Sequence, residues 1–372
     1  MIGGAELSLL DVLAGLQARG HTICLCAPEG GPLLEVARER LIPAREWSIP
    51  KMLRRVGRYS GLLHQVFSPL AAVEAIGSLA SHVRAFQPDV LYSNGVKSHL
   101  LTAAIRPFVA HSIVWHVRDF VAGRRISTPL FAAARLMGVG VLANSRAVAE
   151  EWWARGISAT VVHNGFKPLD CSPHERRCGG SLKFLAVGIL APWKGFERIL
   201  QACAGLPESL NWNLIVCGDE IYETDGHRGE RTRLERIATN LGIANRVNFV
   251  GMVHDLGPFW READVFIHAS IRPEPFGRVV AEAMSAGIPT VAVDAGGIPE
   301  IVRDGIDGIL YPMGDVEALR SAILKLADAP NKRYQMGVAG RKRIANEFSI
   351  DAKVAEIESV FSAASHLTDA NA

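Results

Sequence analysis

The feature that most constrains the fold of this 372-residue chain is a repeated alternation of short apolar runs with amphipathic stretches of helical period. The runs are rich in β-branched residues, and turn residues separate them from the helical stretches. Strands that alternate with helices in this way form parallel sheets covered by helices on both faces. The pattern therefore predicts an α/β fold built from doubly wound, Rossmann-like parallel-sheet domains.

Two such domains are expected, because the chain exceeds one typical core and the alternation is interrupted once. The interruption, residues 167–181, is rich in Pro, Gly, Cys and charge and has no usable period. We predict a first domain over residues 1–167, a second over 168–348, and a C-terminal helix over 349–372. That helix either packs on the second domain or crosses back to the first.

The expected strands can be read from the apolar runs. In the first domain they cover residues 22–27, 90–93, 112–116, 139–143 and 160–163, and in the second 183–187, 213–217, 247–250, 265–268, 289–293 and 308–311. The chain begins oddly, because Gly3-Gly4 leads into an expected helix (residues 5–18) with no strand before it. A doubly wound sheet normally places its first strand centrally. Either the true start lies upstream, which we favour, or the first domain lacks a middle strand and is less stable.

Composition limits the class of protein. Hydrophobic residues make up 49% of the chain, which excludes a disordered polypeptide, yet no stretch reaches the roughly 20 apolar residues that span a bilayer. Glu6 and Asp11 interrupt the first apolar run, so no secretory signal is recognised. The first 170 residues carry 18 Lys and Arg against 12 Asp and Glu, which indicates an anionic partner for this half. Nothing indicates nucleic acid.

Residues 51–67 form a basic amphipathic stretch, in which Lys and Arg alternate with Met, Leu, Val and Phe. Such a stretch either lies on an anionic membrane surface or is an ordinary solvated helix face. Both interpretations remain open from the sequence.

Two glutamates with seven residues between them are the most informative chemical feature. Glu274 precedes the turn Phe276-Gly277, and Glu282 lies more than one turn into the helix that follows. The helix N-terminus between them offers unpaired backbone N–H groups and a positive dipole end, which suit a phosphate. A carboxylate for sugar hydroxyls, amides for phosphate and a carboxylate for a ribose diol together describe a nucleotide-sugar pocket.

Three glycine-bearing loops precede expected helices. Gly3-Gly4 either cradles a phosphate or forms a plain turn. Lys194 begins a helix, where a cation is unfavourable without an anion nearby, so we expect it to bind phosphate. Gly296-Gly297 repeats the arrangement, with Pro299 near the helix start. If the two sheets face each other, these loops converge on one interdomain cleft.

His116 lies where a first-domain strand ends, beside Arg118 and Asp119. The plain alternative is a satisfied core histidine, but its charged neighbours at a strand exit favour a polar cleft position. Asn94 occupies the equivalent place on an earlier strand, unless it is only a turn residue. Asn164-Gly165 is most simply a tight turn at the hinge.

Taken in order, these motifs resemble glycosyltransferase family 4, retaining enzymes with the two-Rossmann-domain (GT-B) architecture. The resemblance covers nearly the whole chain and rests on the ordered set, since each motif alone is weak. The set comprises Gly3-Gly4-Ala5-Glu6, Arg19-Gly20-His21, Asn164-Gly165, Trp193-Lys194-Gly195, Cys217-Gly218-Asp219, Phe249-Val250-Gly251, Glu274 with Glu282, and Gly296-Gly297-Ile298-Pro299-Glu300.

The resemblance implies a role for each group near the donor sugar. Glu282 holds the ribose hydroxyls, and Glu274 holds the donor sugar together with the amides of Phe276 and Gly277. His116 stands at the sugar on the first-domain side.

The resemblance also implies how the rest of the nucleotide is held. Lys194 neutralises the diphosphate, and the backbone at Gly251-Met252 meets the base. One departure matters: many family members carry an arginine where this chain has Ile189. Lys194 therefore lacks that cationic partner unless Arg278 or another residue replaces it.

The expected activity is retaining transfer of a hexose from a nucleoside-diphosphate sugar to a glycan or lipid-linked acceptor. The expected setting is polysaccharide or envelope biosynthesis, in the cytoplasm or at the inner face of the membrane. No cofactor or metal is expected, because no carboxylate cluster at a strand end is placed to hold Mg²⁺.

Rival interpretations are a nucleotide-sugar epimerase of similar fold and a degenerate nucleotide-sugar-binding protein without turnover. A hydrolase using Glu274 and Glu282 is disfavoured, because they flank a helix start rather than one bond. An NAD-dependent oxidoreductase lacks the Gly-x-Gly-x-x-Gly loop.

Overall fold

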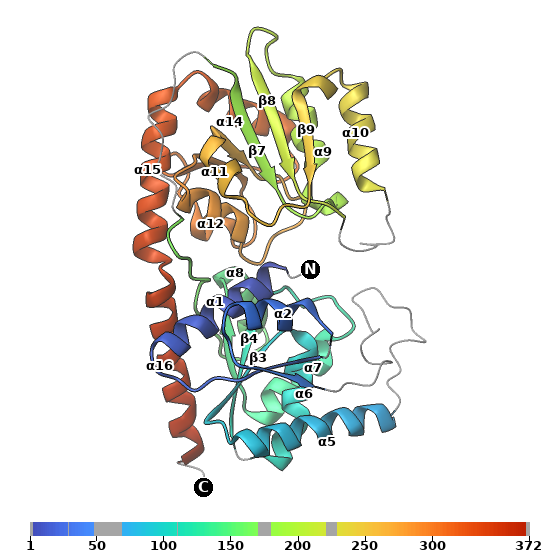
Figure 1. Ribbon diagram of the computed structural model, residues 1–372, viewed down its shortest axis with the longest axis vertical. Coiled ribbons are helices and arrows are strands. Elements are labelled where there is room, and N and C mark those ends of the chain that lie inside the picture. The colour runs from blue at the N-terminus through green and yellow to red at the C-terminus, as the bar shows by residue number, and fades with distance from the viewer. Residues whose placement is uncertain are drawn as a thin grey trace. The chain divides into compact units, whose positions relative to one another are not determined.

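The computed structural model describes residues 3–28, 30–47, 69–109, 111–169, 180–220 and 229–369. The chain forms two compact units: unit 1 comprises Met1–Gly165 with Ile350–Ala372, and unit 2 comprises Phe166–Ser349. Each unit contains parallel strands covered by helices, so the predicted α/β class with two parallel-sheet domains is confirmed (Figure 1).

Unit 1 contains two separate parallel sheets. The larger has the strand order β3-β4-β5-β6, and the smaller pairs β1 with β2. Their bounds are β1 Leu25–Pro28, β2 Ala44–Trp47, β3 Val90–Asn94, β4 Ser112–Val117, β5 Gly140–Ala143 and β6 Thr160–Val161. Strand β2 was not expected, because Ala-Arg-Glu-Trp contains no β-branched residue. Within the described residues no strand joins β1 to β3.

The helices of unit 1 lie on both faces of the larger sheet. Their bounds are α1 Gly4–Ala18, α2 Pro32–Glu39, α5 Pro69–Phe86, α6 Val96–Ile105, the 3₁₀ turn η1 Arg106–Phe108, α7 Ser127–Met137, α8 Arg146–Trp153 and α16 Ile350–Asp369. Helices α1 and α16 pack together against β3, whereas α6 packs with α5 and α7 (Figure 1). The final helix thus belongs to unit 1 and not to the unit that precedes it in the chain.

Unit 2 contains one six-stranded parallel sheet in the order β12-β11-β10-β7-β8-β9. The strands are β7 Leu182–Val187, β8 Trp212–Cys217, β9 Val247–Gly251, β10 Val265–Ile267, β11 Thr290–Val293 and β12 Gly308–Tyr311. The chain proceeds outward from β7 to β9, then returns to the other side of β7. The strand order therefore reverses between β7 and β10, where ligands bind in doubly wound sheets.

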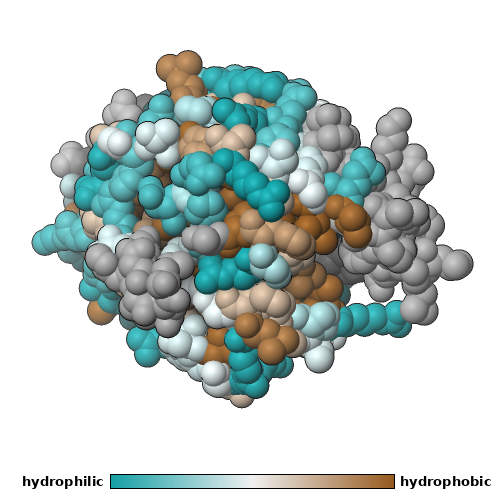
Figure 2. Space-filling view, turned by 90° about the horizontal axis from the view of Figure 1, so that it is seen from below, coloured by the Kyte–Doolittle hydropathy of each residue, from teal (hydrophilic) through white to brown (hydrophobic). Residues whose placement is uncertain are grey.

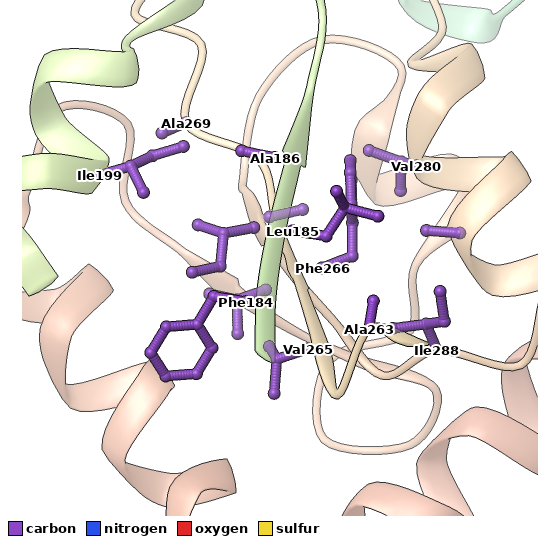
Figure 3. Packing of buried hydrophobic residues seen from close by; sticks show 14 of the residues in the cluster. Phe184, Leu185, Ala186, Ile199, Ala263, Val265, Phe266, Ala269, Val280 and Ile288 are labelled. Carbon is purple, nitrogen blue, oxygen red and sulfur yellow. The ribbon is translucent and has the colours of Figure 1, made fainter. Parts of the chain in front are cut away.

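Two groups of helices cover this sheet. Their bounds are the 3₁₀ turn η2 Pro192–Lys194, α9 Phe196–Ala204, α10 Glu230–Asn240, the 3₁₀ turn η3 Ala244–Arg246, α11 Gly257–Glu262, α12 Arg278–Ser285, α13 Ile298–Ile301, α14 Val316–Ala327 and α15 Pro330–Glu347. Helix α9 packs with α10 and α14, and α12 packs with α13 and α15. Side chains fill the space on both sides of β7, with Phe184 and Val280 fully buried (Figure 3). The strands whose ends carry the candidate site are thus packed into this core.

The surface of unit 1 and the length of its helices bear on the expected membrane contact. Apolar and polar side chains intermingle on the face of unit 1 in Figure 2, and its exposed large apolar residues include Val73, Phe108 and Leu136. No helix in the described part of the chain is both long and apolar enough to cross a bilayer.

The basic stretch 51–67 and most of the predicted linker, residues 170–179, lie outside the described residues.

Candidate functional site

The candidate site in unit 2 lies where the strand order reverses. The turn η2, which ends in Lys194, follows β7, and the segment from His268 to Glu274 follows β10. Parallel neighbouring strands bring both segments to the same edge of the sheet. Residues separated by about 80 positions in sequence therefore meet.

Three donors converge on one oxygen of Glu274. The Lys194 ammonium lies 2.7 Å from Oε1, His268 Nε2 lies 2.8 Å from it, and the Ser270 hydroxyl donates to it at 2.5 Å. The Lys194 ammonium also lies 4.4 Å from the centre of the Trp193 ring. Only 9% of the Glu274 side chain and 14% of the Lys194 side chain are exposed. This is a largely buried ion pair, reinforced by two further hydrogen bonds.

The surroundings of Glu274 decide its charge. Burial by itself raises the pKa of this carboxyl, but the nearby Lys194 and His268 outweigh burial and hold the pKa well below its usual value. Glu274 is therefore ionised at neutral pH. Such a carboxylate accepts hydrogen bonds and has no proton to donate, which suits recognition of hydroxyl groups.

Glycines allow the loops to approach this closely. Gly195 has a φ of +71°, and a Cβ there would lie 1.8 Å from the carbonyl oxygen of Ala269. Gly296 has a φ of +62°, and a Cβ there would lie 2.3 Å from the carbonyl oxygen of Glu274. The amide of Gly297 donates to that same carbonyl at 2.9 Å. The Lys194 and Gly296-Gly297 loops thus both pack against the segment that carries Glu274.

Helix α12 carries the second predicted carboxylate. Glu282 Oε1 accepts a hydrogen bond from Arg278 Nε at 2.7 Å, one turn earlier on the same helix. The Arg278 guanidinium lies 5.3 Å from the centre of the Phe166 ring, which stacks on the buried Phe276. Glu274 and Glu282 therefore flank the start of α12 as predicted. Their hydrogen-bond partners differ, because Glu274 is held by residues outside α12 and Glu282 by Arg278 of its own helix.

The predicted base-binding backbone lies at the end of β9. Gly251, with a φ of +85°, accepts a hydrogen bond from the amide of Gly218 at 2.8 Å. The amide of Gly188 in turn donates to the Cys217 carbonyl at 3.0 Å. The ends of β7, β8 and β9 are thus linked, and Met252 follows at the same sheet edge as Lys194.

Unit 1 holds a separate polar cluster around His116. The ring is buried, and its Nδ1 contacts the Tyr92 hydroxyl and Arg118 Nη2, the latter at 3.1 Å. Arg118 also donates to the side-chain oxygens of Asn94 and Asn164. Asn94 Nδ2 donates to the Ala5 carbonyl in the first turn of α1 at 3.4 Å. His116 is therefore a buried residue within a polar network, and its Nε2 has no hydrogen-bond partner among the described residues. The expected cleft position stays a prediction.

The glycines at the start of α1 lie in this unit as well. The amide of Gly3 donates to Glu6 Oε2 at 3.0 Å, and Gly4 is the first residue of the helix. The Glu6 carboxylate therefore occupies one of the helix N-terminal amides that were expected to face a phosphate.

The structure brings together some predicted residues and adds others. Lys194 lies against Glu274, and it ends a 3₁₀ turn instead of beginning the helix. Its binding of phosphate stays a prediction. His268 and Ser270 were not predicted as site residues. His268 directly follows an apolar strand run and Ser270 lies four positions before Glu274, and that placement is the signal that could have identified them. Tyr92 was likewise missed, because it reads as a strand residue.

Comparisons with known proteins bear on both units. Residues 2–168 match the family described as Glycosyltransferase Family 4, and residues 174–343 match the family described as Glycosyl transferases group 1. A crystal structure of Anabaena Alr3699/HepE in complex with UDP and glucose superposes with a TM-score of 0.79 at 23% identity. That superposition covers 97% of this chain and 96% of the other. It shows that the fold is that of GT-B proteins.

Curated relatives match over parts of the chain. The lipopolysaccharide core biosynthesis glycosyltransferase LpsE of Rhizobium meliloti is 31% identical over 168 residues, which are 45% of this chain and 46% of that protein. The D-inositol 3-phosphate glycosyltransferase of Corynebacterium diphtheriae is 35% identical over 205 residues, which are 52% of this chain and 46% of that protein. The chain thus spans about half the length of the curated relatives it matches.

Proposed function

The chain belongs to the glycosyltransferases, through family 4 in its first half and group 1 in its second, and on this premise we propose that it transfers a hexose from a nucleoside-diphosphate sugar with retention of anomeric configuration. The observation that carries the proposal is the ionised Glu274 beside Lys194 at the strand-order reversal of unit 2. A carboxylate suits neutral sugar hydroxyls, and an ammonium suits a diphosphate.

Lys194 serves the leaving group in this proposal. An ammonium has three donors, and one bond to Glu274 leaves two for phosphate oxygens. Charge on the departing diphosphate grows in the transition state, so a cation placed there lowers the barrier. Protein groups then neutralise the diphosphate, and we expect activity to persist after treatment with EDTA.

The remaining donor contacts follow the family pattern. Glu282, oriented by Arg278, accepts from the ribose hydroxyls, and the backbone at Gly251-Met252 meets the base. The amides of Phe276 and Gly277 complete the sugar and phosphate contacts at the start of α12. His116 of unit 1 contributes to the sugar site.

The acceptor is proposed to be a glycan or a lipid-linked saccharide, bound by the basic unit 1. The relatives named for lipopolysaccharide core biosynthesis and for D-inositol 3-phosphate support a polyhydroxylated acceptor. Polysaccharide or envelope biosynthesis, in the cytoplasm or at the inner face of the membrane, is the proposed setting.

The test is a donor screen with purified chain and UDP-, GDP- and ADP-hexoses, with and without saccharide acceptors. Acceptor-dependent release of nucleoside diphosphate supports the proposal, and Glu274→Gln or Lys194→Ala should reduce turnover by about 100-fold. Conversion of the donor without any acceptor would instead indicate an epimerase. Calorimetric binding of a nucleoside diphosphate with no turnover would indicate a binding protein.

A further inference from the structure

The hydrogen bonds of His116 determine where its ring proton lies. Arg118 Nη2 is 3.1 Å from His116 Nδ1, and the Tyr92 hydroxyl contacts the same atom. A guanidinium can only donate. His116 Nδ1 must therefore be the acceptor, so it carries no proton, and the single proton of the neutral ring lies on Nε2.

Arg118 is itself held in a fixed orientation. Its Nε donates to Asn94 Oδ1 at 2.5 Å, and its Nη1 donates to Asn164 Oδ1. These amides come from the end of β3 and from the segment after β6. Each of the three nitrogens of the planar guanidinium thus donates a hydrogen bond, and only 8% of the residue is exposed. Lysine has a single compact ammonium and cannot make these three hydrogen bonds in the plane of one group.

We propose that Arg118 is a positioning residue, which holds His116 as a neutral ring with its proton on Nε2, so that His116 acts as a hydrogen-bond donor to a sugar oxygen and not as a base. His116 Nε2 is buried and has no hydrogen-bond partner within the described residues. A buried donor without an acceptor is costly, and a ligand oxygen would satisfy it. Contact requires a small shift of the atoms that cover Nε2. The identity of that oxygen rests on the proposed function; the state of the ring does not.

The electrostatic surroundings agree with a neutral ring. Burial, the Arg118 charge and the neighbouring His99 together hold the pKa of His116 well below its usual value. His99, on α6, has its pKa lowered to about 3 by burial and by Arg118. Among the described residues, the titratable or charged groups that act on or contact His116 are Tyr92 from β3, His99 from α6 and Arg118, which follows β4. None of these three is a carboxylate that would stabilise an imidazolium.

The direct test is long-range ¹H–¹⁵N NMR of the full chain, with the His116 signals assigned from their loss in His116→Gln. We expect a pyrrole-like Nε2 and a pyridine-like Nδ1 that persist between about pH 8 and 5. An Nδ1–H tautomer, a mixture or an imidazolium in this range would overturn the proposal. This arm needs no variant of Arg118, so it decides even if such variants fold poorly.

Two variants distinguish the effect of Arg118 on the His116 tautomer from that of Tyr92. Arg118→Lys keeps the positive charge but loses the planar set of N–H donors, so we expect a mixture of tautomers at His116. Tyr92→Phe retains Arg118 and should keep the single Nε2–H form. A single Nε2–H tautomer in Arg118→Lys would contradict the positioning role.

The role of His116 as a hydrogen-bond donor is measured separately, by kinetics with UDP-glucose or with the nucleotide sugar selected in the donor screen. His116→Gln retains an N–H donor and should keep a kcat/KM about tenfold above that of His116→Phe. Equal losses in both would refute the donor role. If no nucleotide sugar is turned over by the wild-type chain, the proposed function fails, while the NMR result still decides the state of the ring.

Discussion

At the scale of single residues, the site depends on how one carboxylate is held. Oε1 of Glu274 receives bonds from Lys194, His268 and Ser270, and none of the described bonds reaches Oε2. This arrangement fixes the carboxylate and leaves one oxygen for a ligand. Sequence motifs pointed to Glu274 and Lys194, whereas His268 and Ser270 became visible only through their contacts with Glu274.

A pair of His268 variants tests this role. His268→Met removes a hydrogen bond to a charged group, which is worth about 1.5–3 kcal/mol, so KM for the donor should rise by about 10- to 100-fold. His268→Gln keeps an N–H donor in a similar place and should retain most of the affinity. The matched control is His254→Met, since His254 is exposed in the same unit. Equal KM values for the Met and Gln variants would show that the hydrogen bond is not what matters.

The lowered pKa of Glu274 predicts a stability profile. Because the pKa is depressed in the folded protein, the contribution to the free energy of unfolding is fully present above the ordinary pKa of about 4.3. It is lost as pH falls through the lowered folded pKa. Urea unfolding between about pH 7 and 3 should therefore show a steeper acid loss for wild type than for Glu274→Gln. Parallel profiles would mean that folding does not lower the pKa of Glu274.

At the scale of elements, loops at the edge of the unit 2 sheet meet because glycines permit it. Gly195 lets η2 approach the carbonyl of Ala269 after β10, and this approach places Lys194 against Glu274. Gly296 plays the same part for the loop after β11. The site is thus a property of three strand ends rather than of one motif.

Gly195→Ala tests the close approach of these loops. The added Cβ meets a backbone oxygen and the residue keeps a positive φ, so the cost should be at least about 1–3 kcal/mol. Turnover should fall as well, because Lys194 is displaced. Gly180→Ala is the control, since a Cβ there meets nothing within 4 Å. Thermal unfolding and turnover would be compared, and a Gly195→Ala variant as stable and active as the control would contradict the prediction.

Strand positions were largely predictable from sequence, for a local reason. Buried parallel strands need continuous β-branched and apolar residues, and such runs are legible without tertiary knowledge. β2 was missed because Ala44–Trp47 contains two charged residues, and it forms by pairing with β1. Pairing between separated segments is not visible in local composition.

At the scale of the whole molecule, the last helix completes the first unit. The chain leaves unit 1 after Gly165 and returns at Ile350. Within unit 2, Phe166 donates its amide to the Phe348 carbonyl at 2.8 Å, so the outgoing and returning segments run together. In unit 1, Val354 and Ile357 of α16 join a core with Val12 of α1. Unit 1 is therefore built from both ends of the chain.

Ile357→Ala should destabilise unit 1 specifically. Ile357 is fully buried, so its truncation should cost about 2–5 kcal/mol. Ser359→Ala, an exposed change on the same helix, should be nearly neutral. Hydrogen exchange of β3 and β4 amides should accelerate in Ile357→Ala while exchange in β7 and β8 is unchanged. Equal acceleration in both units would show that α16 does not act through unit 1 alone.

The amino-acid order by itself determined the α/β class, most strand positions and the presence of Glu274, Glu282 and Lys194 near helix starts, because these depend on local propensity and spacing. Tertiary structure alone decided which side chains share an oxygen or a ring nitrogen. It joined His268 and Ser270 to Glu274, and Arg118 to His116, and it returned α16 to unit 1. Such contacts depend on how strands are ordered in a sheet, and that order is set by packing between segments far apart in the chain.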